Sequence, residues 1–383
     1  MDPATRDRLL RLAGVLLIAL AGSAIVILVV QRGLGRDYAS YDLSAYVAAA
    51  DRFRRGVSLY PQLDAASFRL GDLGLFLYPP PVALLFLPAL GVSFAVASAL
   101  WGIALTVLAV VVAVALARAV APARRPLAIG LTLGAFPLQW ELANGNLTLV
   151  TMALALIAWR MRAAVWRSAV PLALASGLKL LVAPALLAVA LSGRRRIALA
   201  TCGLALAIVV VSWPVQGAAW REWVVVTLRL SQGVPTAAYN VVPEALRGGV
   251  GRIALGAIAL AVLVACGAIA RTRRVDERLA FAAALVTGPY VSAFVFYPYV
   301  LFLLPLVVLL VLGDTPPLAR VAGIAAWALA DIQAFDPLTA YPTALVATAI
   351  GVGAVFALAA GAPAGDDPKS LWTGGRRDLV SGP

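Results

Sequence analysis

Apolar stretches separated by short polar segments run through the chain from about residue 12 to residue 360. As a helix, a crossing of the bilayer's hydrocarbon core takes about 20 apolar residues. The pattern therefore predicts an all-α polytopic membrane protein with about 10 to 13 crossings. Several stretches are shorter than a full crossing, so we expect them to be tilted, broken or re-entrant. The predicted spans are 12–30, 79–92, 94–117, 126–140, 146–159, 169–191, 197–213, 252–270, 279–296, 299–313, 318–331 and 341–360.

Two longer polar segments interrupt the apolar pattern. Residues 31–78 and 214–251 are predicted to be loops on the outer face. Each is expected to carry a helix lying in the plane of the membrane interface, over 41–56 in the first and 219–232 in the second. A charged, tyrosine-rich helix directly after the first span is the more unusual of the two.

Composition agrees with a membrane protein and limits the number of domains. Hydrophobic residues make up 62% of the 383 residues and charged residues 13%, with a mean hydropathy of +0.94. A soluble protein of this size has no means of covering that much apolar surface. We interpret residues 1–360 as one membrane-embedded domain, followed by a polar, disordered cytoplasmic tail at 361–383.

Basic residues predict the orientation of the chain in a bacterial cytoplasmic membrane. The net charge of +13 gathers in short loops, which is typical of orientation signals and gives no basis for nucleic-acid binding. Arg6, Arg8 and Arg11 precede the first span and place the N-terminus in the cytoplasm. The loop 31–78 then lies outside.

Further basic loops favour the cytoplasm and create two conflicts of topology. They are 118–125, 160–167, 194–196 and 271–278. The second and third flank a single apolar stretch, so this stretch enters the membrane and returns, or one loop breaks the rule. A hairpin would put Lys179, at its midpoint, near the outer side. For loop 118–125, either the proline-rich piece 79–92 does not cross, or the loop breaks the rule.

The residue types present restrict the chemistry. The chain has no histidine, so acid–base work falls to Asp, Glu, Lys, Tyr or Arg, and we expect neither a metal site nor a cofactor. Cys202 and Cys266 lie in apolar runs and are interpreted as small hydrophobic residues, with no disulfide between them.

Asp42 is the first candidate for a catalytic group. On a helix that starts near Tyr41, Asp42 shares one face with Tyr46, Ala49 and Phe53. The alternative is that Asp42 caps the helix N-terminus, a position that aspartate favours, or is a solvated charge. Asp42 as a carboxylate facing the helix bundle is the functional hypothesis.

Other candidates lie at the boundaries of predicted spans. Asn144 and Asn146 form a polar turn between two short spans, suited either to a simple turn or to binding sugar hydroxyls. Lys179, isolated in an apolar stretch, either extends to the surface or binds a lipid phosphate. Aromatic side chains at such boundaries commonly anchor the membrane interface, and they are the alternative to a substrate-binding role for Tyr78, Tyr297 and Tyr299.

Taken together, these motifs resemble glycosyltransferase family 87 of the GT-C superfamily. The resemblance rests on YDLSAY after the first span, LYPPPVALL, the Asn-x-Asn turn, Gly-Leu-Lys in a broken apolar segment, and a Gly-Arg-Arg-Arg loop. It is strongest over residues 37–196. The family includes polyprenyl-phosphate-mannose-dependent α-mannosyltransferases.

The resemblance implies a GT-C-like bundle and a function. Such an enzyme moves a hexose, here expected to be mannose, from a polyprenyl-phosphate donor to a glycolipid or glycan acceptor at the outer face, with inversion. Asp42 matches the essential carboxylate. Lys179, with Arg229 or Arg69, is expected to stabilise the leaving phosphate. The Asn-x-Asn turn and Lys179 also match family motifs. The full set of residues that we predict to bind substrate is Lys179, Asn144, Asn146, Tyr46, Tyr78, Arg229, Tyr297 and Tyr299.

One departure and two alternatives remain open. Many relatives have a histidine about where Tyr297-Pro298-Tyr299 stands here, which puts histidine-assisted acceptor activation in doubt. A polytopic transporter or lipid flippase would carry charges inside several spans and show inverted halves. A structural or assembly protein would leave Asp42 and Lys179 individually dispensable.

Overall fold

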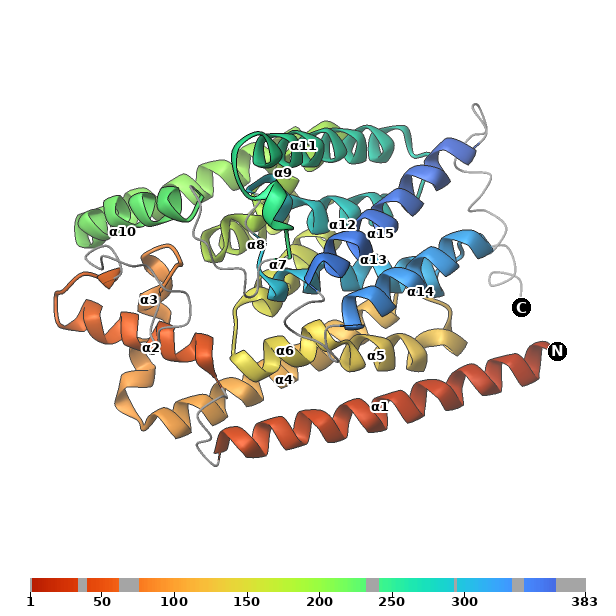
Figure 1. Cartoon of the computed structure of the whole chain (residues 1–383), viewed down its shortest axis with the longest axis horizontal. Helices are drawn as coiled ribbons and strands as arrows, with labels where there is room; N and C mark the ends of the chain where they lie inside the picture. The colour runs from red at the N-terminus through yellow and green to blue at the C-terminus, as the bar shows by residue number, and fades with distance from the viewer. Residues whose placement is uncertain are drawn as a thin grey trace, which may run out of the picture.

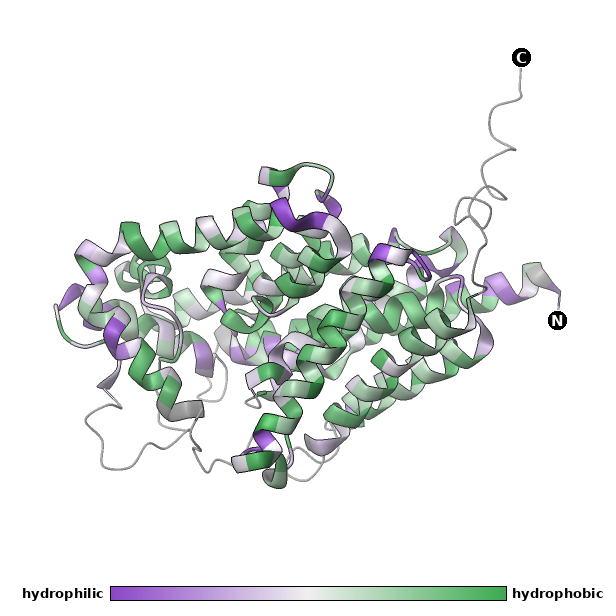
Figure 2. Cartoon of the chain, turned by 90° about the horizontal axis from the view of Figure 1, so that it is seen from above, coloured by the Kyte–Doolittle hydropathy of each residue, from purple (hydrophilic) through white to green (hydrophobic). Residues whose placement is uncertain are grey.

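The computed structural model describes residues 2–33, 40–61, 76–231, 241–292, 295–332 and 341–362, and these residues form helices joined by short connections. No β-strand occurs in these ranges, which confirms the predicted all-α class. The long helices consist mostly of hydrophobic residues, whereas hydrophilic residues occur mainly at helix ends and in loops (Figure 2).

The helices vary widely in length, from three residues to 37. In chain order they are α1 (Pro3–Gly33), α2 (Tyr41–Arg54), α3 (Pro81–Leu85), η2 (Leu87–Gly91), α4 (Phe94–Ala117), η3 (Pro122–Arg124), α5 (Arg125–Gly134), α6 (Phe136–Asn144), α7 (Thr148–Arg160), α8 (Val165–Leu178), η4 (Leu180–Val182), α9 (Ala185–Val189), η5 (Ala190–Arg194), α10 (Arg195–Ser231), η6 (Glu244–Leu246), α11 (Gly249–Thr272), α12 (Glu277–Thr287), η7 (Gly288–Ser292), η8 (Tyr297–Leu303), α13 (Leu304–Leu312), α14 (Pro317–Asp331) and α15 (Tyr341–Gly361).

Length and hydropathy identify five helices that can cross a membrane, or six when the bent pair α6–α7 counts as one. The five are Ala4–Gln31, Phe94–Ala117, Leu180–Leu228, Gly249–Thr272 and Pro342–Gly361, of which Leu180–Leu228 joins η4, α9, η5 and α10 across a non-helical backbone at Gly193. The predicted span 94–117 coincides with α4. The chain is thus a multi-pass membrane protein, and the figure of 10 to 13 crossings stays a prediction that depends on the shorter helices.

Prolines explain why several apolar runs break into short helices. A proline stands at one of the first two positions of α3, α5, α6, α13 and α14, where its missing N–H costs no helical hydrogen bond. The predicted single span 126–140 is wrong for this reason. It is two helices, α5 and α6, separated at Ala135, whose backbone is extended. Pro137 then opens α6.

The basic loops gather at one end of the molecule, which we call the basic end. Arg278 donates to the carbonyl of Ala119 over 3.4 Å, and Arg124 donates to that of Leu312 over 2.8 Å. The first half of α1 packs beside Pro126. The N-terminus lies at the same side of the molecule, and α2 and α3 lie at the opposite side, which we call the far end (Figure 1).

The structure resolves both conflicts of topology. Arg162 and Arg194 both bind Glu277, so the two flanks of the apolar stretch lie together and the stretch is a hairpin. Its outward arm is α8, its return arm is η4, α9 and η5, and Lys179 stands between them. The piece 79–92 folds into α3 and η2, each of five residues, which pack on α2 and do not cross.

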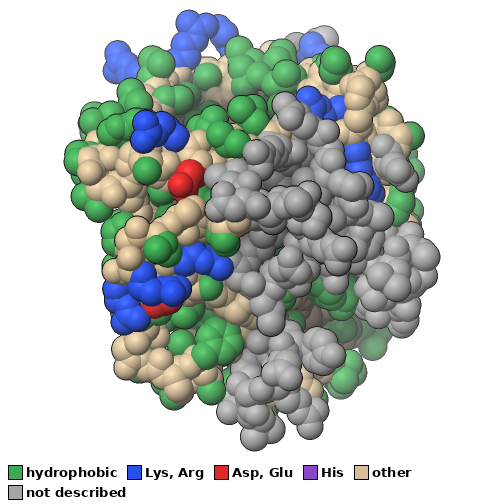
Figure 3. All heavy atoms as spheres, turned by 60° about the vertical axis from the view of Figure 1, so that its left-hand side comes forward, with side chains coloured by type: hydrophobic (Ala, Val, Ile, Leu, Met, Phe, Trp, Pro, Cys, Tyr) green, Lys and Arg blue, Asp and Glu red, His purple; other side chains and the backbone are tan. Residues whose placement is uncertain are grey.

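The second predicted outer segment begins inside a helix. α10 continues through residue 214 to Ser231, with a break at Gln216 two residues after Pro214. The predicted helix 219–232 is therefore the last part of α10. Its Glu222 accepts a hydrogen bond from Ser58 over 2.8 Å, which fastens it to the segment that follows α2. On the face of the molecule that Figure 3 shows, basic side chains are spread among apolar ones.

Candidate functional site

Asp42 and Asn146, more than 100 residues apart in sequence, form the centre of a polar cluster at the far end. The Asn146 amide donates to Asp42 Oδ2 over 2.7 Å. Asn146 is buried, whereas Asp42 is half-buried. The predicted carboxylate and one predicted amide therefore meet directly, and they come from α2 and from the turn between α6 and α7.

Lys179 joins this cluster through neutral oxygens. Its ammonium donates to Asn146 Oδ1 over 2.5 Å and to Thr148 Oγ1 over 2.7 Å. The residue is only 4% exposed, so the alternative in which it extends to the surface is wrong. Within the described residues Lys179 forms no ion pair, and the hydrogen bonds of its ammonium go to an amide oxygen and a hydroxyl.

Tyrosine rings complete the surroundings of the ammonium. Lys179 Nζ lies 4.5 Å from the ring centre of Tyr299 and 5.2 Å from that of Tyr78, within the range of cation–π attraction. The hydroxyl of Tyr46 donates to that of Tyr78 over 2.8 Å. Three of the predicted tyrosines thus gather around the cluster. Tyr46 on α2 is fully buried, so it does not face the membrane.

The start of α2 fixes the position of Asp42. Ser40 precedes the helix with a left-handed backbone, donates its N–H to the carbonyl of Ala143 over 2.8 Å, and shares a hydroxyl–hydroxyl hydrogen bond with Ser98 of α4. Ser40 therefore occupies the N-cap position, and the alternative that Asp42 caps the helix is wrong. Asp42 stands in the first turn, where the helix dipole favours a carboxylate.

The turn that carries Asn146 is fixed by its backbone geometry and by contacts with Trp101. α6 and α7 meet at 119°, and Gly145 between them has a φ of 72°, which favours glycine. A Cβ there would come within 3.1 Å of Trp101. The indole of Trp101 donates to the Gly145 carbonyl over 2.8 Å. One turn of α4, through Ser98 and Trp101, thus positions both α2 and this turn.

The electrostatic setting shifts the pKa of Asp42. Burial disfavours the carboxylate and raises its pKa above the usual 3.8, while the Asn146 hydrogen bond and the charge of Lys179 oppose that rise. Because burial prevails, Asp42 is a stronger base than an exposed aspartate. Within hydrogen-bond reach of a hydroxyl it can accept a proton.

Glu141 belongs to the same region, although the sequence argument gave it no role. It is fully buried on α6, and its Oε1 accepts the backbone N–H of Leu149 over 2.7 Å. Its Oε2 is buried and has no hydrogen-bond partner among the described residues. A glutamate one helical turn before an Asn-Gly-Asn turn was the available signal.

Other predicted site residues lie outside this network. The Asn144 amide donates back to the Trp140 carbonyl over 2.9 Å. The Tyr297 hydroxyl donates to the Ala330 carbonyl over 2.9 Å, and its ring lies 6.0 Å from that of Trp140. Tyr297 is 1% exposed, so it is no interface anchor. The side chain of Arg229 and the whole of Arg69 lie outside the described part of the structure.

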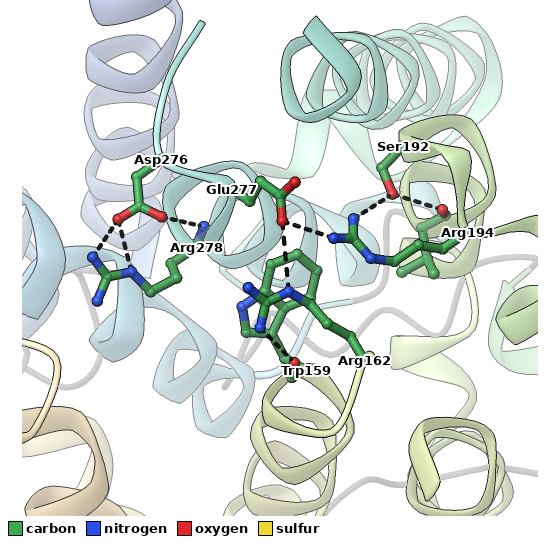
Figure 4. Close-up of polar contacts among 8 residues, drawn as sticks. Trp159, Arg162, Ser192, Arg194, Asp276, Glu277 and Arg278 are labelled. Carbon is green, nitrogen blue, oxygen red and sulfur yellow. Dashed lines mark hydrogen bonds and ion pairs between the residues drawn. The ribbon is translucent and has the colours of Figure 1, made fainter. Parts of the chain in front are cut away.

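A second polar cluster lies at the basic end (Figure 4). Glu277 Oε2 binds Arg194 over 2.7 Å and Arg162 over 3.5 Å. Both guanidinium groups also lie on the ring of Trp159, at 5.2 and 4.6 Å. Trp159 stacks on Phe281 with ring centres 4.4 Å apart. This cluster ties α7, η5 and α12 together, and each arginine has a carboxylate.

Comparison with known proteins gives one match. The sequence model of glycosyltransferase family 87 matches residues 76–298, more than half of the chain. The matched region contains Tyr78, Asn146 and Lys179 and begins after Asp42. Neither the curated proteins nor the solved structures yield a match.

Proposed function

The chain belongs to glycosyltransferase family 87, and on that premise we propose that it transfers a hexose from a polyprenyl-phosphate donor to a glycolipid or glycan acceptor. Mannose is the sugar to test first. The reaction takes place at the outer face of a bacterial cytoplasmic membrane, with the N-terminus in the cytoplasm. The observation that carries the proposal is a buried ammonium that forms no ion pair within the described ranges, joined through one amide to a half-buried aspartate.

Lys179 supplies the site for the donor's phosphate. A lysine at membrane depth is costly unless an anion compensates it. Asn146 and Thr148 hold the ammonium in place without neutralising it. A phosphate that binds there gains charge-assisted hydrogen bonds, and these strengthen as negative charge develops on the leaving oxygen.

Asp42 acts as the general base. The acceptor's hydroxyl oxygen forms a bond to the anomeric carbon of the sugar, while the bond from that carbon to the phosphate oxygen breaks. The hydroxyl proton passes to the Asp42 carboxylate, and the electron pair of the broken bond stays on the polyprenyl phosphate. A single displacement of this kind inverts the anomeric centre. A well-placed base contributes roughly 10²–10⁴-fold to the rate.

Asn146 couples the two charged groups. Its amide nitrogen donates to Asp42 and its carbonyl oxygen accepts from Lys179, so one side chain sets the spacing of base and phosphate site. Tyr78 and Tyr299 offer ring faces beside the ammonium, against which a sugar or an isoprene unit can pack. In this proposal Asn144 and Tyr297 stabilise the position of α6 and do not bind substrate.

The position of α2 suits a lipid-linked donor. α1 crosses the membrane, and α2 follows at the far end, so Asp42 stands near the level where a lipid carrier keeps its phosphate. This explains a charged helix directly after the first span. Membership of a glycosyltransferase family gives the transporter and flippase alternatives no support.

The decisive experiment is a transfer assay with purified full-length protein in detergent. It offers polyprenyl-phosphate-mannose with a radiolabelled sugar to a membrane glycolipid extract, and it compares the parent protein with Asp42→Asn. We expect transfer by the parent and a loss of roughly 10²–10⁴-fold in the variant. Glu222→Gln, which neutralises another carboxylate at the far end, is the matched control.

Each other result has a distinct meaning. Equal transfer by both proteins would remove Asp42 from its role and keep the donor. Donor binding without transfer by either protein would point to another sugar or acceptor. Absence of donor binding would overturn the polyprenyl-phosphate donor.

A further inference from the structure

Glu141 presents a buried carboxylate oxygen that has no hydrogen-bond partner among the described residues. Glu141 is 0% exposed, and Oε2 has no partner within the described ranges. An unpaired carboxylate oxygen in a protein interior is destabilising, since the charge loses its hydration. The helix cap that Oε1 gives to Leu149 needs only one neutral acceptor, which glutamine also has. The cap therefore does not explain why the residue at position 141 carries a second carboxylate oxygen and a negative charge.

The charge of Glu141 acts on the phosphate site. Oε1 of Glu141 accepts from the N–H of Leu149, and the preceding residue, Thr148, binds the Lys179 ammonium, so a carboxylate lies close to that ammonium. Within the described structure the two groups are not within ion-pair distance. Glu141 therefore reduces the positive potential at Lys179 without occupying its hydrogen-bonding positions, which Asn146 and Thr148 take.

We propose that Glu141 is a positioning residue that weakens the preference of the Lys179 site for a phosphate monoester over a phosphate diester, and so promotes release of the product lipid. This inference rests on the proposed function, because that reaction converts one into the other. The donor is a diester with one negative charge. The polyprenyl phosphate left after transfer is a monoester with between about 1.5 and 2 negative charges near neutral pH.

The weaker preference for the monoester follows from simple electrostatics. A lysine alone attracts the monoester more strongly, because attraction scales with the ligand's charge. A fixed carboxylate nearby repels the ligand, and this repulsion also scales with the ligand's charge. The more highly charged monoester is therefore repelled more strongly than the diester. Since the site is buried, salt screens the effect little. Without Glu141, the enzyme would hold its own product and turnover would slow.

The test measures binding of two sugar-free probes, so the identity of the sugar does not matter. They are a polyprenyl phosphate and its methyl diester with the same chain, compared by competition on the full-length protein in detergent at about pH 8, where the monoester is close to doubly charged. The parent protein is expected to bind both lipids, with only a small preference for the monoester. Glu141→Gln should tighten monoester binding by about tenfold and diester binding by clearly less.

Matched variants separate charge from structure. Glu141→Asp keeps the charge and should keep the parent's ratio of the two affinities, whatever it does to the α7 cap. Glu222→Gln removes a carboxylate bound to Ser58 at the same end and should change neither affinity. In transfer assays, product inhibition should become stronger in Glu141→Gln alone.

The outcomes distinguish this inference from the function on which it rests. A parent protein that binds neither lipid overturns the lipid-phosphate donor, and the inference falls with it. A parent that binds the monoester more than about tenfold more tightly than the diester overturns the inference alone, even if Glu141→Gln fails to fold. An unchanged affinity ratio in a folded Glu141→Gln variant also overturns it.

Discussion

The two polar clusters of this protein treat their positive charges in opposite ways. At the basic end, Arg162 and Arg194 share the carboxylate of Glu277 and are partly exposed. At the far end, Lys179 is 4% exposed and is held by an amide and a hydroxyl. The more deeply buried charge thus has the weaker compensation, which is the reverse of what stability alone would produce.

The difference separates a structural cluster from a binding site. Glu277 neutralises the charge of its two arginines, and these ion pairs hold three helices together. Asn146 and Thr148 fix the Lys179 ammonium and leave its charge for a ligand. Polar groups that are fixed in place but left uncompensated are the arrangement by which sites stabilise developing charge.

Replacing Lys179 should have the largest effect. Lys179→Met keeps the length of the side chain and removes the charge, so kcat/KM for the lipid-linked donor should fall roughly 10²–10³-fold. Donor-dependent kinetics in detergent measure it. Arg194→Met at the basic end is the control and should retain activity. Similar losses in both variants would break the comparison.

The pH profile gives the next largest effect. Only ionised Asp42 accepts a proton, so kcat/KM should fall about tenfold for each pH unit below its pKa. Burial raises that pKa above 3.8, so the acid limb lies at higher pH than for an exposed aspartate. Lys179 opposes the rise, hence Lys179→Met should move the limb to still higher pH. A limb that moves down, or stays, would contradict this electrostatic account.

Replacing Trp101, which positions the turn at Gly145, should have a moderate effect on activity. Trp101→Phe keeps an aromatic ring beside Phe86 but removes the donor to the Gly145 carbonyl. The loss of one hydrogen bond at the turn that carries Asn146 should lower kcat/KM about three- to tenfold. Trp166→Phe, at a position on α8 that is 65% exposed, should behave like the parent. Equal activity of all three proteins would show that this turn holds without α4.

Glu277 should have the smallest effect on activity. Glu277→Gln leaves two arginines without their carboxylate, so the protein should lose about 1–2 kcal/mol of stability. Thermal unfolding in detergent measures the loss, and donor turnover should stay within about twofold of the parent. A fall in turnover without a fall in melting temperature would place the basic end in the reaction.

The fold class and several members of the site could be predicted from the sequence, whereas the contacts between those members could not. Hydropathy located α1, α4, α11 and α15, because long apolar runs have few alternatives in a bilayer. Basic loops around 169–191 indicated the hairpin. The run 126–140 was misjudged because apolar periodicity does not show where Pro137 and an extended Ala135 split a helix.

The site itself shows the same limit. Asp42, Asn146 and Lys179 could be chosen as candidates from residue type and place. That one amide joins the other two, and that Asn144 points back to Trp140, depends on the 119° bend at Gly145, which no local pattern encodes. Glu141 was missed because its significance lies in an unpaired oxygen, a property of packing.

The hairpin from α8 to η5 has a consequence for how the chain enters the membrane during synthesis. Since it leaves the basic end and returns there, it contributes no net change of side, and we expect it to insert as one unit. Reporter domains fused after Arg162 and after Arg196 should therefore report the same compartment. The orientation of every later helix is then independent of this unit, and a folding defect confined to it would leave the rest of the topology intact.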